Sequence, residues 1–245
     1  MRTALVTGAA GGIGSATVAR LVAQGYAVTA LDVDPSVHSL VDDLPDDTVL
    51  PVTADTRDRA ALQGAVDRTL ERWGRLDAVV AAAAVIAGGR PLWETPDEEL
   101  DELWSVDARG VWLTAAVSVP AMLAGPDPSG CRFVAVASAA GSTGLFRLAG
   151  YTAVKHAVVG MVRGLAADLV GTGVTAVAVS PGSTRTPMLE QTAAIYGASI
   201  DDLAQHQLLQ RPLEPGEVAA TIAFCCSREG AALNGSVVAV DGGFT

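Results

Sequence analysis

The sequence has few of the residues that mark several common classes of protein. It contains three cysteines, Cys131, Cys225 and Cys226, and three histidines, His38, His156 and His206. An odd number of cysteines without a Cys-x-x-Cys pair excludes a disulfide framework, and the scattered histidines complete no metal-ligand pattern. We therefore expect buried, inert thiols in a reducing compartment, and no metal site.

Positive charge is also scarce. The 245 residues carry 16 basic and 27 acidic side chains, for a formal net charge of −11. Nucleic acids and anionic membranes attract basic faces, so this balance argues against both as partners. The longest aliphatic stretch, residues 78–87, is about half of a ~20-residue membrane span, and the first residues lack the apolar run of a secretory signal. We expect a soluble, cytoplasmic protein.

Lysine is nearly absent. Lys155 stands alone beside 15 arginines. Arginine and lysine are close to interchangeable on a solvated surface, but not where a compact ammonium group is needed. The single lysine therefore indicates a chemical role at residue 155.

What the sequence has is a regular alternation of short apolar runs and longer amphipathic segments. The runs predict strands at residues 3–6, 27–31, 49–53, 78–82, 133–137, 174–179 and 237–240. The segments predict helices at residues 12–23, 57–73, 96–123, 151–170 and 215–226. Continuously apolar strands suit a parallel sheet that is covered on both faces. We expect a single domain over residues 1–245, with an α/β Rossmann-type fold in which helices cover both faces of a doubly wound, mostly parallel seven-stranded sheet.

A glycine-rich turn joins the first expected strand to the first expected helix. Its sequence is Thr7-Gly8-Ala9-Ala10-Gly11-Gly12-Ile13-Gly14. Glycines let the backbone turn tightly and approach a pyrophosphate, whose charge the amides at the helix N-terminus bind. The spacing is Gly-x-x-x-Gly-x-Gly rather than Gly-x-Gly-x-x-Gly, and a plain tight turn without a ligand is the alternative.

Acidic residues follow the second and third expected strands, at the edge where ligands bind in such sheets. Asp32 lies 18 residues after the last glycine of the turn, close to the ~20 expected for an acid that binds the adenosine ribose. Its carboxylate repels a 2′-phosphate, and neither the glycine turn nor the residues just after Asp32 include Arg or Lys, which favours NAD over NADP. Asp32 is alternatively a solvated loop acid, like Asp34, Asp42 and Asp43. Asp55 is placed to accept from the adenine amino group or to cap a helix.

Tyr151 and Lys155 lie four residues apart at the start of an expected helix, so both side chains share one face. A free tyrosine has a pKa of about 10, and a neighbouring cation favours its phenolate. Such a phenol exchanges a proton with an alcohol or carbonyl oxygen near neutral pH. Ser138, at the end of the fifth expected strand, adds a hydroxyl that can hold the same oxygen. Together with the glycine turn, these residues are far more specific than Tyr-x-x-x-Lys alone.

These segments resemble the short-chain dehydrogenase/reductase family, of the classical type, over essentially the whole chain. The matching segments are Thr7-Gly8…Gly12-Ile13-Gly14, Asp32, Asp55, Ser138, Tyr151…Lys155, Ser180-Pro181-Gly182…Thr186 and Val240-Asp241-Gly242-Gly243. The resemblance implies that Tyr151 is the general acid/base and that Ser138 positions the reactive oxygen. It implies two roles for Lys155, which lowers the pKa of Tyr151 and binds the nicotinamide ribose. It also implies that residues 181–186 hold the nicotinamide carboxamide and that the chain forms a homotetramer or homodimer.

The motifs and the resemblance together predict a full set of site residues. The predicted catalytic residues are Ser138, Tyr151, Lys155 and Asp107. The predicted NAD-binding residues are Gly8, Gly11, Gly12, Ile13, Gly14, Asp32, Val33, Asp55, Thr56, Ala82, Ala83, Ala84, Val106, Tyr151, Lys155, Pro181, Gly182, Ser183 and Thr186. The predicted substrate contacts are Ser138, Ala140, Leu145, Tyr151, Gly182 and Met188.

Two segments depart from the family. Residues 81–84 are four alanines where the family usually has Asn-Asn-Ala-Gly, so two polar side chains are lost and a Cβ is added beside the cofactor. Asp107 stands where the family usually has a catalytic Asn, which supports a proton relay partly through its main-chain carbonyl. We expect the relay to persist with an altered pH dependence, because the added carboxylate attracts Lys155.

The resemblance also indicates what covers the substrate. A lid at about residues 183–211 supplies apolar side chains, as does the loop before Tyr151. These side chains are Leu145, Phe146, Leu148, Met188, Leu189, Ile195 and Tyr196. A pocket lined in this way favours an apolar secondary alcohol or ketone. Packing within the lid or at a subunit interface explains the same residues equally well.

The sequence therefore predicts an NAD-dependent oxidoreductase that interconverts a secondary alcohol and a ketone. Residues 84–95 and 149–156 are similar to a subgroup associated with mycofactocin, whose members hold NAD without ready exchange and pass electrons to that carrier. One alternative is an NADP-linked 3-oxoacyl carrier reductase, which Asp32 disfavours. Another is a nucleotide-binding sensor or scaffold without turnover, which the alanine run and Asp107 leave open.

Overall fold

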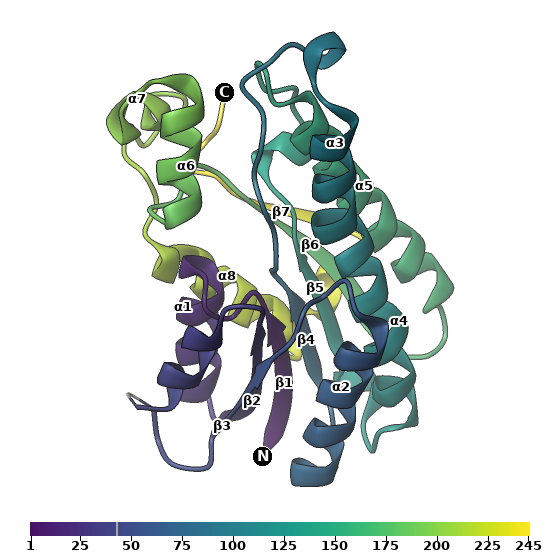
Figure 1. Cartoon of the computed structure of the whole chain (residues 1–245). Coiled ribbons are helices and arrows are strands. Elements are labelled where there is room, and N and C mark those ends of the chain that lie inside the picture. The colour runs from purple at the N-terminus through teal and green to yellow at the C-terminus, as the bar shows by residue number, and fades with distance from the viewer. Residues whose placement is uncertain (43) are drawn as a thin grey trace.

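The computed structural model describes residues 1–42 and 44–245, so Asp43 lies outside the described residues. Seven strands form one sheet in the order β3-β2-β1-β4-β5-β6-β7 (Figure 1). The strands are β1 (Arg2–Thr7), β2 (Tyr26–Asp32), β3 (Val49–Thr53), β4 (Ala78–Ala81), β5 (Arg132–Val136), β6 (Thr175–Pro181) and β7 (Val237–Val240). All six strand pairings of this sheet are parallel. The strand order reverses at β1, which confirms the predicted doubly wound fold.

Helices cover both faces of the sheet. One layer consists of α1 (Gly12–Ala23) and α8 (Pro215–Cys226), and the other of α2 (Arg59–Trp73), α4 (Arg109–Ala124) and α5 (Ala149–Asp168) (Figure 1). Three shorter helices, α3 (Asp97–Leu103), α6 (Pro187–Tyr196) and α7 (Ile200–Ala204), lie beyond the carboxyl ends of the strands. Short 3₁₀ segments are Pro35–Val41, Leu92–Glu94, Pro128–Gly130, Ala139–Gly141 and Glu229–Leu233, and Trp104–Ala108 is a π turn.

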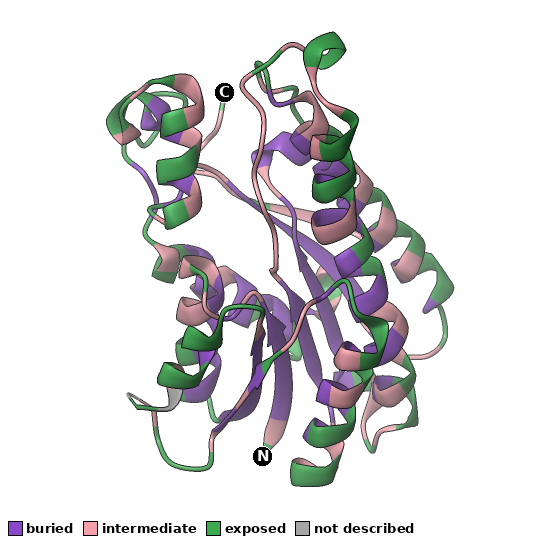
Figure 2. Cartoon of the chain, viewed as in Figure 1, coloured by how far each residue is buried: buried purple, intermediate pink, exposed green. Residues whose placement is uncertain are grey.

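The core has two halves because successive strand residues point to opposite sides of the sheet. On β5, Phe133 and Ala135 pack against α2, α4 and α5, whereas Val134 and Val136 pack against α1 and α8. Figure 2 shows the buried strands between helices whose outer sides are exposed. Burying each aliphatic side chain stabilises the fold by roughly 1.5–3 kcal/mol. Because the sheet is buried on both faces, the strand ends are held in place, and so are the loops after them that carry the site.

The structure corrects the prediction of one helix over residues 96–123. Helix α3 ends at Leu103, the π turn follows, and α4 begins at Arg109. A π turn places an extra residue in the helical turn and so changes which side chains face inward. Asp107 lies in this turn and is fully buried.

Two helices lie in a segment for which the sequence predicts no element. Residues 187–196 form α6 and residues 200–204 form α7. Thr186 caps α6, because its hydroxyl accepts a hydrogen bond from the Leu189 N–H, and Pro187 occupies the first turn. The other predicted helices and strands are confirmed, with ends that differ by no more than a few residues.

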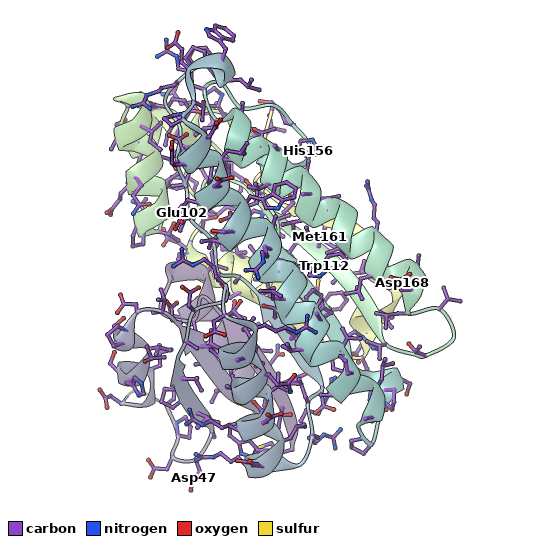
Figure 3. All side chains as sticks on the ribbon, turned by 45° about the vertical axis from the view of Figure 1, so that its right-hand side comes forward. Asp47, Glu102, Trp112, His156, Met161 and Asp168 are labelled. Carbon is purple, nitrogen blue, oxygen red and sulfur yellow. The ribbon has the colours of Figure 1, made fainter. Side chains whose placement is uncertain are left out.

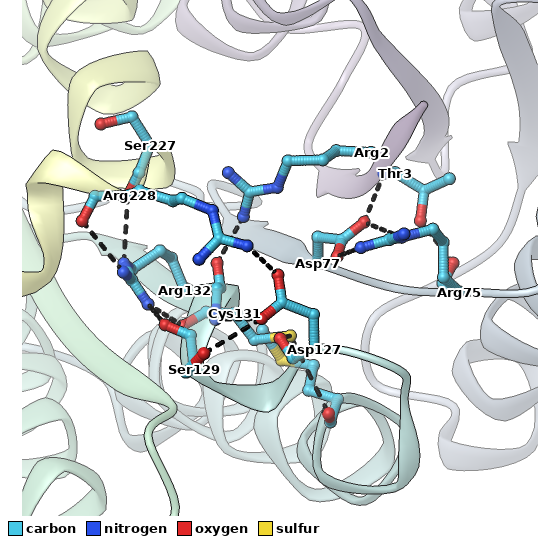
Figure 4. Close-up of polar contacts among 12 residues, drawn as sticks. Arg2, Thr3, Arg75, Asp77, Asp127, Ser129, Cys131, Arg132, Ser227 and Arg228 are labelled. Atoms are coloured by element: carbon cyan, nitrogen blue, oxygen red, sulfur yellow. Dashed lines mark hydrogen bonds and ion pairs between the residues drawn. The ribbon is translucent and has the colours of Figure 1, made fainter.

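A buried polar network closes the opposite edge of the sheet, near the amino ends of the strands (Figure 4). Asp77, just before β4, accepts a hydrogen bond from the Thr3 N–H at 2.8 Å and forms an ion pair with Arg75 at 2.6 Å. Arg132, at the start of β5, donates to the carbonyl oxygen of Ser227, which follows α8. These contacts join β1, β4, β5 and α8 at the edge opposite the ligand-binding edge, so this network is structural.

The structure places the cysteines in the interior and some large apolar side chains at the surface. All three cysteines are buried and unpaired, as predicted, and burial raises the pKa of the Cys131 and Cys225 thiols to about 11. No helix in the described part of the chain is long and apolar enough to cross a membrane. The outer faces of α4 and α5 carry Trp112, which is 61% exposed, and Met161, which is half-buried (Figure 3).

Candidate active site

The glycine turn between β1 and α1 leaves no room for a Cβ at Gly8 or Gly14. Gly8 has φ +69°, and a Cβ there would lie 2.6 Å from the Ala83 nitrogen. A Cβ at Gly14 would lie 1.9 Å from the Gly8 carbonyl oxygen. The N-cap of α1 is Gly11, and no side chain caps the helix there. This backbone-lined cradle at a helix N-terminus is the arrangement that binds a pyrophosphate.

Asp32 ends β2 beside the glycine turn. Its Oδ2 accepts a hydrogen bond from the Ala10 N–H at 2.9 Å, and its Oδ1 accepts one from the Asp34 N–H at 2.9 Å. Each carboxylate oxygen has a second lone pair, so the group can still accept from a ribose hydroxyl. These two contacts fix the direction of the carboxylate before any ligand arrives.

Asp55 follows β3 and does not cap α2, since Asp58 is the N-cap of that helix. Asp55 instead forms an ion pair with Arg57 at 2.7 Å, and Arg57 also reaches Glu102 at 3.2 Å. Hydrogen bonds from Arg57 lower the pKa of the Asp55 carboxyl. Sequence reasoning missed Arg57 and Glu102, which both line the cavity described next. The position of Arg57, two residues after Asp55 at the same strand end, was the available signal.

A cavity of about 680 Å³ runs along the carboxyl edge of the sheet, from the glycine turn to the start of α5. Most of the predicted site residues line it. They are Gly8, Gly11, Gly12, Ile13, Gly14, Asp32, Val33, Asp55, Thr56, Ala82, Ala83, Ala84, Val106, Ser138, Leu145, Tyr151, Lys155, Pro181, Gly182, Ser183, Thr186 and Met188.

Two predicted residues do not line the cavity. Ala140 is fully buried in the cluster that also holds Tyr151, so the structure corrects its assignment as a substrate contact. Asp107 is also fully buried and contacts two lining residues, Lys155 and Val85.

Further lining residues come from the lid and from the last residues of the sequence. Helix α6 contributes Gln191 and Thr192, which share one face with Met188 at spacings of three and four. This spacing is the sequence signal for Gln191 and Thr192 as lining residues. It can be used only once the start of α6 is recognised. Phe244 lines the cavity as well, and its backbone bridges to Gln207. No sequence pattern marks this contact.

Tyr151, Lys155 and Ser138 come together at one end of the cavity. The Lys155 Nζ lies 5.5 Å from the centroid of the Tyr151 ring, one turn away on α5. Ser138 follows β5, and its Oγ accepts a hydrogen bond from the Ala140 N–H at 3.2 Å. Burial raises the pKa of the Tyr151 phenol, Lys155 and a hydrogen bond with Ser138 oppose that rise, and Asp107 adds to it.

A buried ion pair joins Asp107 to Lys155. The Asp107 Oδ2 lies 3.0 Å from the Lys155 Nζ, and their side chains are 0% and 3% exposed. The Asp107 Oδ1 accepts from the Val85 N–H at 2.8 Å, and Lys155 also donates to the Val136 carbonyl at 3.5 Å. Burial lowers the pKa of Lys155, but Asp107 and Tyr151 more than offset it, so this pKa lies above its usual value.

The alanine run at residues 81–84 is held through its backbone. The N–H groups of Ala82 and Ala83 donate to the Thr7 hydroxyl at 3.2 and 3.4 Å. The next amide, that of Val85, donates to Asp107. These main-chain hydrogen bonds hold the loop beside the cavity that Ala82, Ala83 and Ala84 line.

Only some of the expected apolar residues face the substrate end of the cavity. Leu145, Leu148, Met188 and Leu189 line it, together with Ile86. The structure corrects the other three expectations. Phe146 is 73% exposed, and neither Ile195 nor Tyr196 belongs to the lining. The Tyr196 hydroxyl instead donates to the Phe146 carbonyl at 2.6 Å and ties α6 to the loop before Tyr151.

Comparison with known proteins decides the family. A family model described as "Enoyl-(Acyl carrier protein) reductase" matches residues 8–245. The chain is 31% identical to the levodione reductase of Leifsonia aquatica, over 99% of this chain and 93% of that protein. The chain belongs to the short-chain dehydrogenase/reductase family. This confirms the resemblance, and it makes the protein a nucleotide-dependent oxidoreductase of that family.

Three further comparisons agree with membership of the short-chain dehydrogenase/reductase family. It is 34% identical to an uncharacterized NAD-dependent oxidoreductase of Mycobacterium tuberculosis, over 99% of this chain and 95% of that protein. The crystal structure of levodione reductase superposes with a TM-score of 0.91, covering 98% of this chain and 96% of that chain. A Brucella melitensis 3-ketoacyl-(acyl-carrier-protein) reductase complexed with NADH gives a TM-score of 0.90 at 27% identity, covering 99% and 97%.

Proposed function

We propose that this short-chain dehydrogenase/reductase uses NAD to interconvert an apolar secondary alcohol and the corresponding ketone, with Tyr151 as general acid/base. The observation that carries the proposal is that Tyr151, Lys155 and Ser138 lie in one cavity with the glycine cradle. The cradle fits a dinucleotide because its glycines line the cavity and the N-terminal amides of α1 have no side-chain cap. When bound, the nicotinamide supplies or accepts the hydride.

The chain's own residues then hold the reactive oxygen and move one proton. In reduction, the Tyr151 hydroxyl gives its proton to the carbonyl oxygen as the carbonyl carbon gains the hydride. In oxidation, the phenolate takes the proton of the alcohol hydroxyl as the carbon loses the hydride. Ser138 donates a hydrogen bond to the same oxygen and stabilises the charge that develops on it. Lys155 holds a positive charge beside the phenol, and its remaining hydrogen would be available to the ribose of a bound nicotinamide nucleotide.

The choice of NAD rests on charge. Asp32 places a fixed carboxylate at the end of β2, where the extra phosphate of NADP would meet it. The cation that lines this region, Arg57, already pairs with Asp55 and Glu102. A relative is named an NAD-dependent oxidoreductase, and a structural neighbour carries NADH, which supports the same choice. The NADP-linked 3-oxoacyl carrier reductase is therefore the weaker candidate.

We propose the class of substrate from the side chains that face the substrate end of the cavity. Residues 183–211 form a lid on the one domain of residues 1–245, and α6 turns Met188 and Leu189 toward the cavity. Leu145 and Leu148 face them from the loop before Tyr151. Apolar walls around the Tyr151 and Ser138 hydroxyls suit a hydrophobic molecule with one ketone or hydroxyl group. The name of the relative levodione reductase agrees with carbonyl reduction.

The coupling to mycofactocin, with tightly held NAD, and the homotetramer or homodimer remain predictions from the resemblance. Trp112 is exposed on α4, so its side chain is available for a subunit contact. Native mass spectrometry of the purified protein tests both points. Retained NAD supports the coupling, and the mass of the particle counts the chains.

Turnover with a Tyr151→Phe variant tests the proposed reaction. The purified protein is mixed with NADH and a panel of ketones, and with NAD⁺ and a panel of secondary alcohols. We expect Tyr151→Phe to lower kcat by about 10²–10⁴-fold, because the proton transfer loses its acid or base. NADH binding, followed by fluorescence, should persist in the variant.

Tyr26→Phe is the matched control for this experiment. Tyr26 is also buried, and its hydroxyl donates to the Cys226 carbonyl at 3.0 Å, away from the cavity. This variant should unfold at a lower temperature while it keeps its turnover. A rate that stays undiminished in Tyr151→Phe refutes the mechanism. Nucleotide binding without turnover of any substrate would favour the sensor or scaffold instead.

A further inference from the structure

The charges that face the Tyr151 phenol come from two neighbouring elements. Helix α5 supplies Lys155, and the π turn supplies Asp107. The segment after β5 contributes the neutral Ser138, and α6 contributes the neutral phenol of Tyr196, which packs on the same apolar cluster. Helix α3 contributes the apolar Leu103 to that cluster.

The buried pair changes what Lys155 can do for Tyr151. A lone buried ammonium would attract a phenolate strongly, because little water screens the charges. Here the carboxylate of Asp107 lies 3.0 Å from that ammonium, and both side chains are buried. The pair has no net charge. Removing the Tyr151 proton therefore leaves one uncompensated negative charge in a site that is shielded from water, which is costly.

We propose that Asp107 is a positioning residue that cancels the charge of Lys155 and so keeps Tyr151 protonated, in the form that gives a proton to a carbonyl oxygen. This inference rests on the proposed function and adds the direction in which the reaction is favoured. At neutral pH the site is set for ketone reduction. Alcohol oxidation, which needs the phenolate, is expected to gain speed only as the pH becomes alkaline. The contribution of Asp107 to the raised pKa of Tyr151 agrees with this arrangement.

The Asp107→Asn variant isolates the charge with little change of shape. Its amide oxygen can still accept from the Val85 N–H, as Oδ1 does now at 2.8 Å. Its amide NH₂ replaces Oδ2 and faces the Lys155 ammonium, so the acceptor of that ion pair is lost. The ammonium is then free to stabilise a Tyr151 phenolate.

Titration of tyrosinate by ultraviolet absorbance tests the proposal without any turnover. The chain has three tyrosines, so individual steps can be resolved. Burial raises the pKa of Tyr26 to about 12 and also raises that of Tyr196. We expect Asp107→Asn to show one tyrosine that titrates at lower pH than any tyrosine of the unmodified protein. That step should vanish in Asp107→Asn combined with Tyr151→Phe.

The pH profile of turnover gives a second readout. The measured quantity is the rate of alcohol oxidation at pH 7 with saturating NAD⁺, divided by the plateau rate at alkaline pH. This ratio should be about tenfold or more higher in Asp107→Asn than in the unmodified protein. Each unit by which the pKa of Tyr151 falls multiplies its phenolate fraction by ten below that pKa. Asp77→Asn is the matched control, since Asp77 is also buried and paired, with Arg75. It should lower stability and leave the Tyr151 step and the profile in place, although the pKa of Tyr26 should fall because Asp77 helps to raise it.

The outcomes separate the two proposals. Identical tyrosinate titrations of the unmodified protein and a folded Asp107→Asn variant overturn the role of Asp107. If Asp107→Asn fails to fold by circular dichroism, the difference titration between the unmodified protein and Tyr151→Phe decides. The proposal requires Tyr151 to titrate above the ordinary value of about 10, and titration below it overturns the proposal. Absence of nicotinamide-dependent turnover would contradict the proposed function while leaving the titration result intact.

Discussion

Asp32 is the residue whose charge separates the two nicotinamide cofactors. The Asp32→Asn variant removes the charge. It keeps one of the two acceptor oxygens, so one of the loop amides of Ala10 and Asp34 retains its hydrogen bond. We expect the ratio of kcat/KM for NADP(H) to that for NAD(H) to rise by about tenfold or more, because repulsion of the 2′-phosphate is lost. Initial rates with both cofactors measure this ratio. Asp67→Asn, on the exposed side of α2, makes the same change in net charge and should leave the ratio unaltered.

Gly14 is the glycine with the least space around it. A Cβ there would meet the Gly8 carbonyl oxygen at 1.9 Å, so the backbone of the turn must move. We expect Gly14→Ala to destabilise the protein by about 1–3 kcal/mol or more and to abolish nucleotide binding. Urea unfolding and NADH fluorescence measure the two effects.

Gly64 provides the contrast. It lies inside α2, and a Cβ there would meet nothing within 4 Å. Gly64→Ala should stabilise the protein by about 0.5–1 kcal/mol and leave nucleotide binding unchanged. Equal losses of binding in Gly14→Ala and Gly64→Ala would show that the crowding at Gly14 is not the cause.

At the scale of single residues, the sequence can point to groups that act at strand ends. Asp32 ends a strand and Ser138 follows one, so both have a local pattern. Tyr151 and Lys155 form a helical pair, which is a local pattern as well. The predicted attraction between Asp107 and Lys155 is confirmed, but the geometry of this ion pair depends on a π turn that no local pattern indicates. Its geometry comes from tertiary contacts and therefore had to be seen in the structure.

At the scale of elements, the capping of α2 shows how one side chain defines a helix start. Asp58 accepts hydrogen bonds from the N–H groups of Ala60 at 2.8 Å and Ala61 at 3.2 Å. We expect Asp58→Ala to lower the free energy of unfolding by about 0.5–2 kcal/mol, and Asp58→Ser to recover most of it. Urea denaturation measures both. A loss of the same size in Asp67→Ala, within α2, would argue against a capping effect.

The misplaced helix ends have physical reasons at the same scale. The apolar pattern over residues 96–123 continues without a break, so periodicity alone predicts one helix. The chain departs from it at Trp104–Ala108, where Asp107 gains an ion pair and a backbone donor. Helix α6 was missed for another reason. The resemblance assigns its cap, Thr186, to the cofactor loop of residues 181–186, and Pro187 in its first turn received no interpretation.

At the scale of the whole molecule, the alternation of strands and helices was enough to predict the sheet. Strands buried on both faces need helices on both sides, and right-handed crossovers then leave few possible orders. The observed order β3-β2-β1-β4-β5-β6-β7 places β1, β4 and β5 at the centre. The glycine turn and Ser138 follow β1 and β5, so one edge of the sheet collects residues far apart in the sequence.

The acidic character of the whole chain predicts how its stability depends on pH. Hydrogen bonds from Arg211 and from the Glu214 N–H lower the pKa of Glu217 from 4.5 to about 2. Hydrogen bonds likewise lower the pKa of Asp34, Asp55 and Asp202. As the pH falls below about 4.5, the unfolded chain binds protons that the folded chain does not, so folding becomes less favourable. The pKa of Asp107 is instead raised by burial, so the protonation of this carboxyl at low pH favours the folded chain.

We therefore expect the melting temperature, measured by calorimetry, to fall between about pH 5 and pH 3, as the carboxylates of lowered pKa are titrated in the unfolded chain. Glu217→Gln should make this fall less steep, since the glutamine keeps an acceptor for Arg211 but cannot titrate. Glu71→Gln, at an exposed position of α2, removes the same charge and should retain the slope of the unmodified protein. Equal slopes in all three proteins would mean that the Arg211–Glu217 contact does not contribute to acid unfolding, and that the fall has its origin in general repulsion among positive charges at low pH.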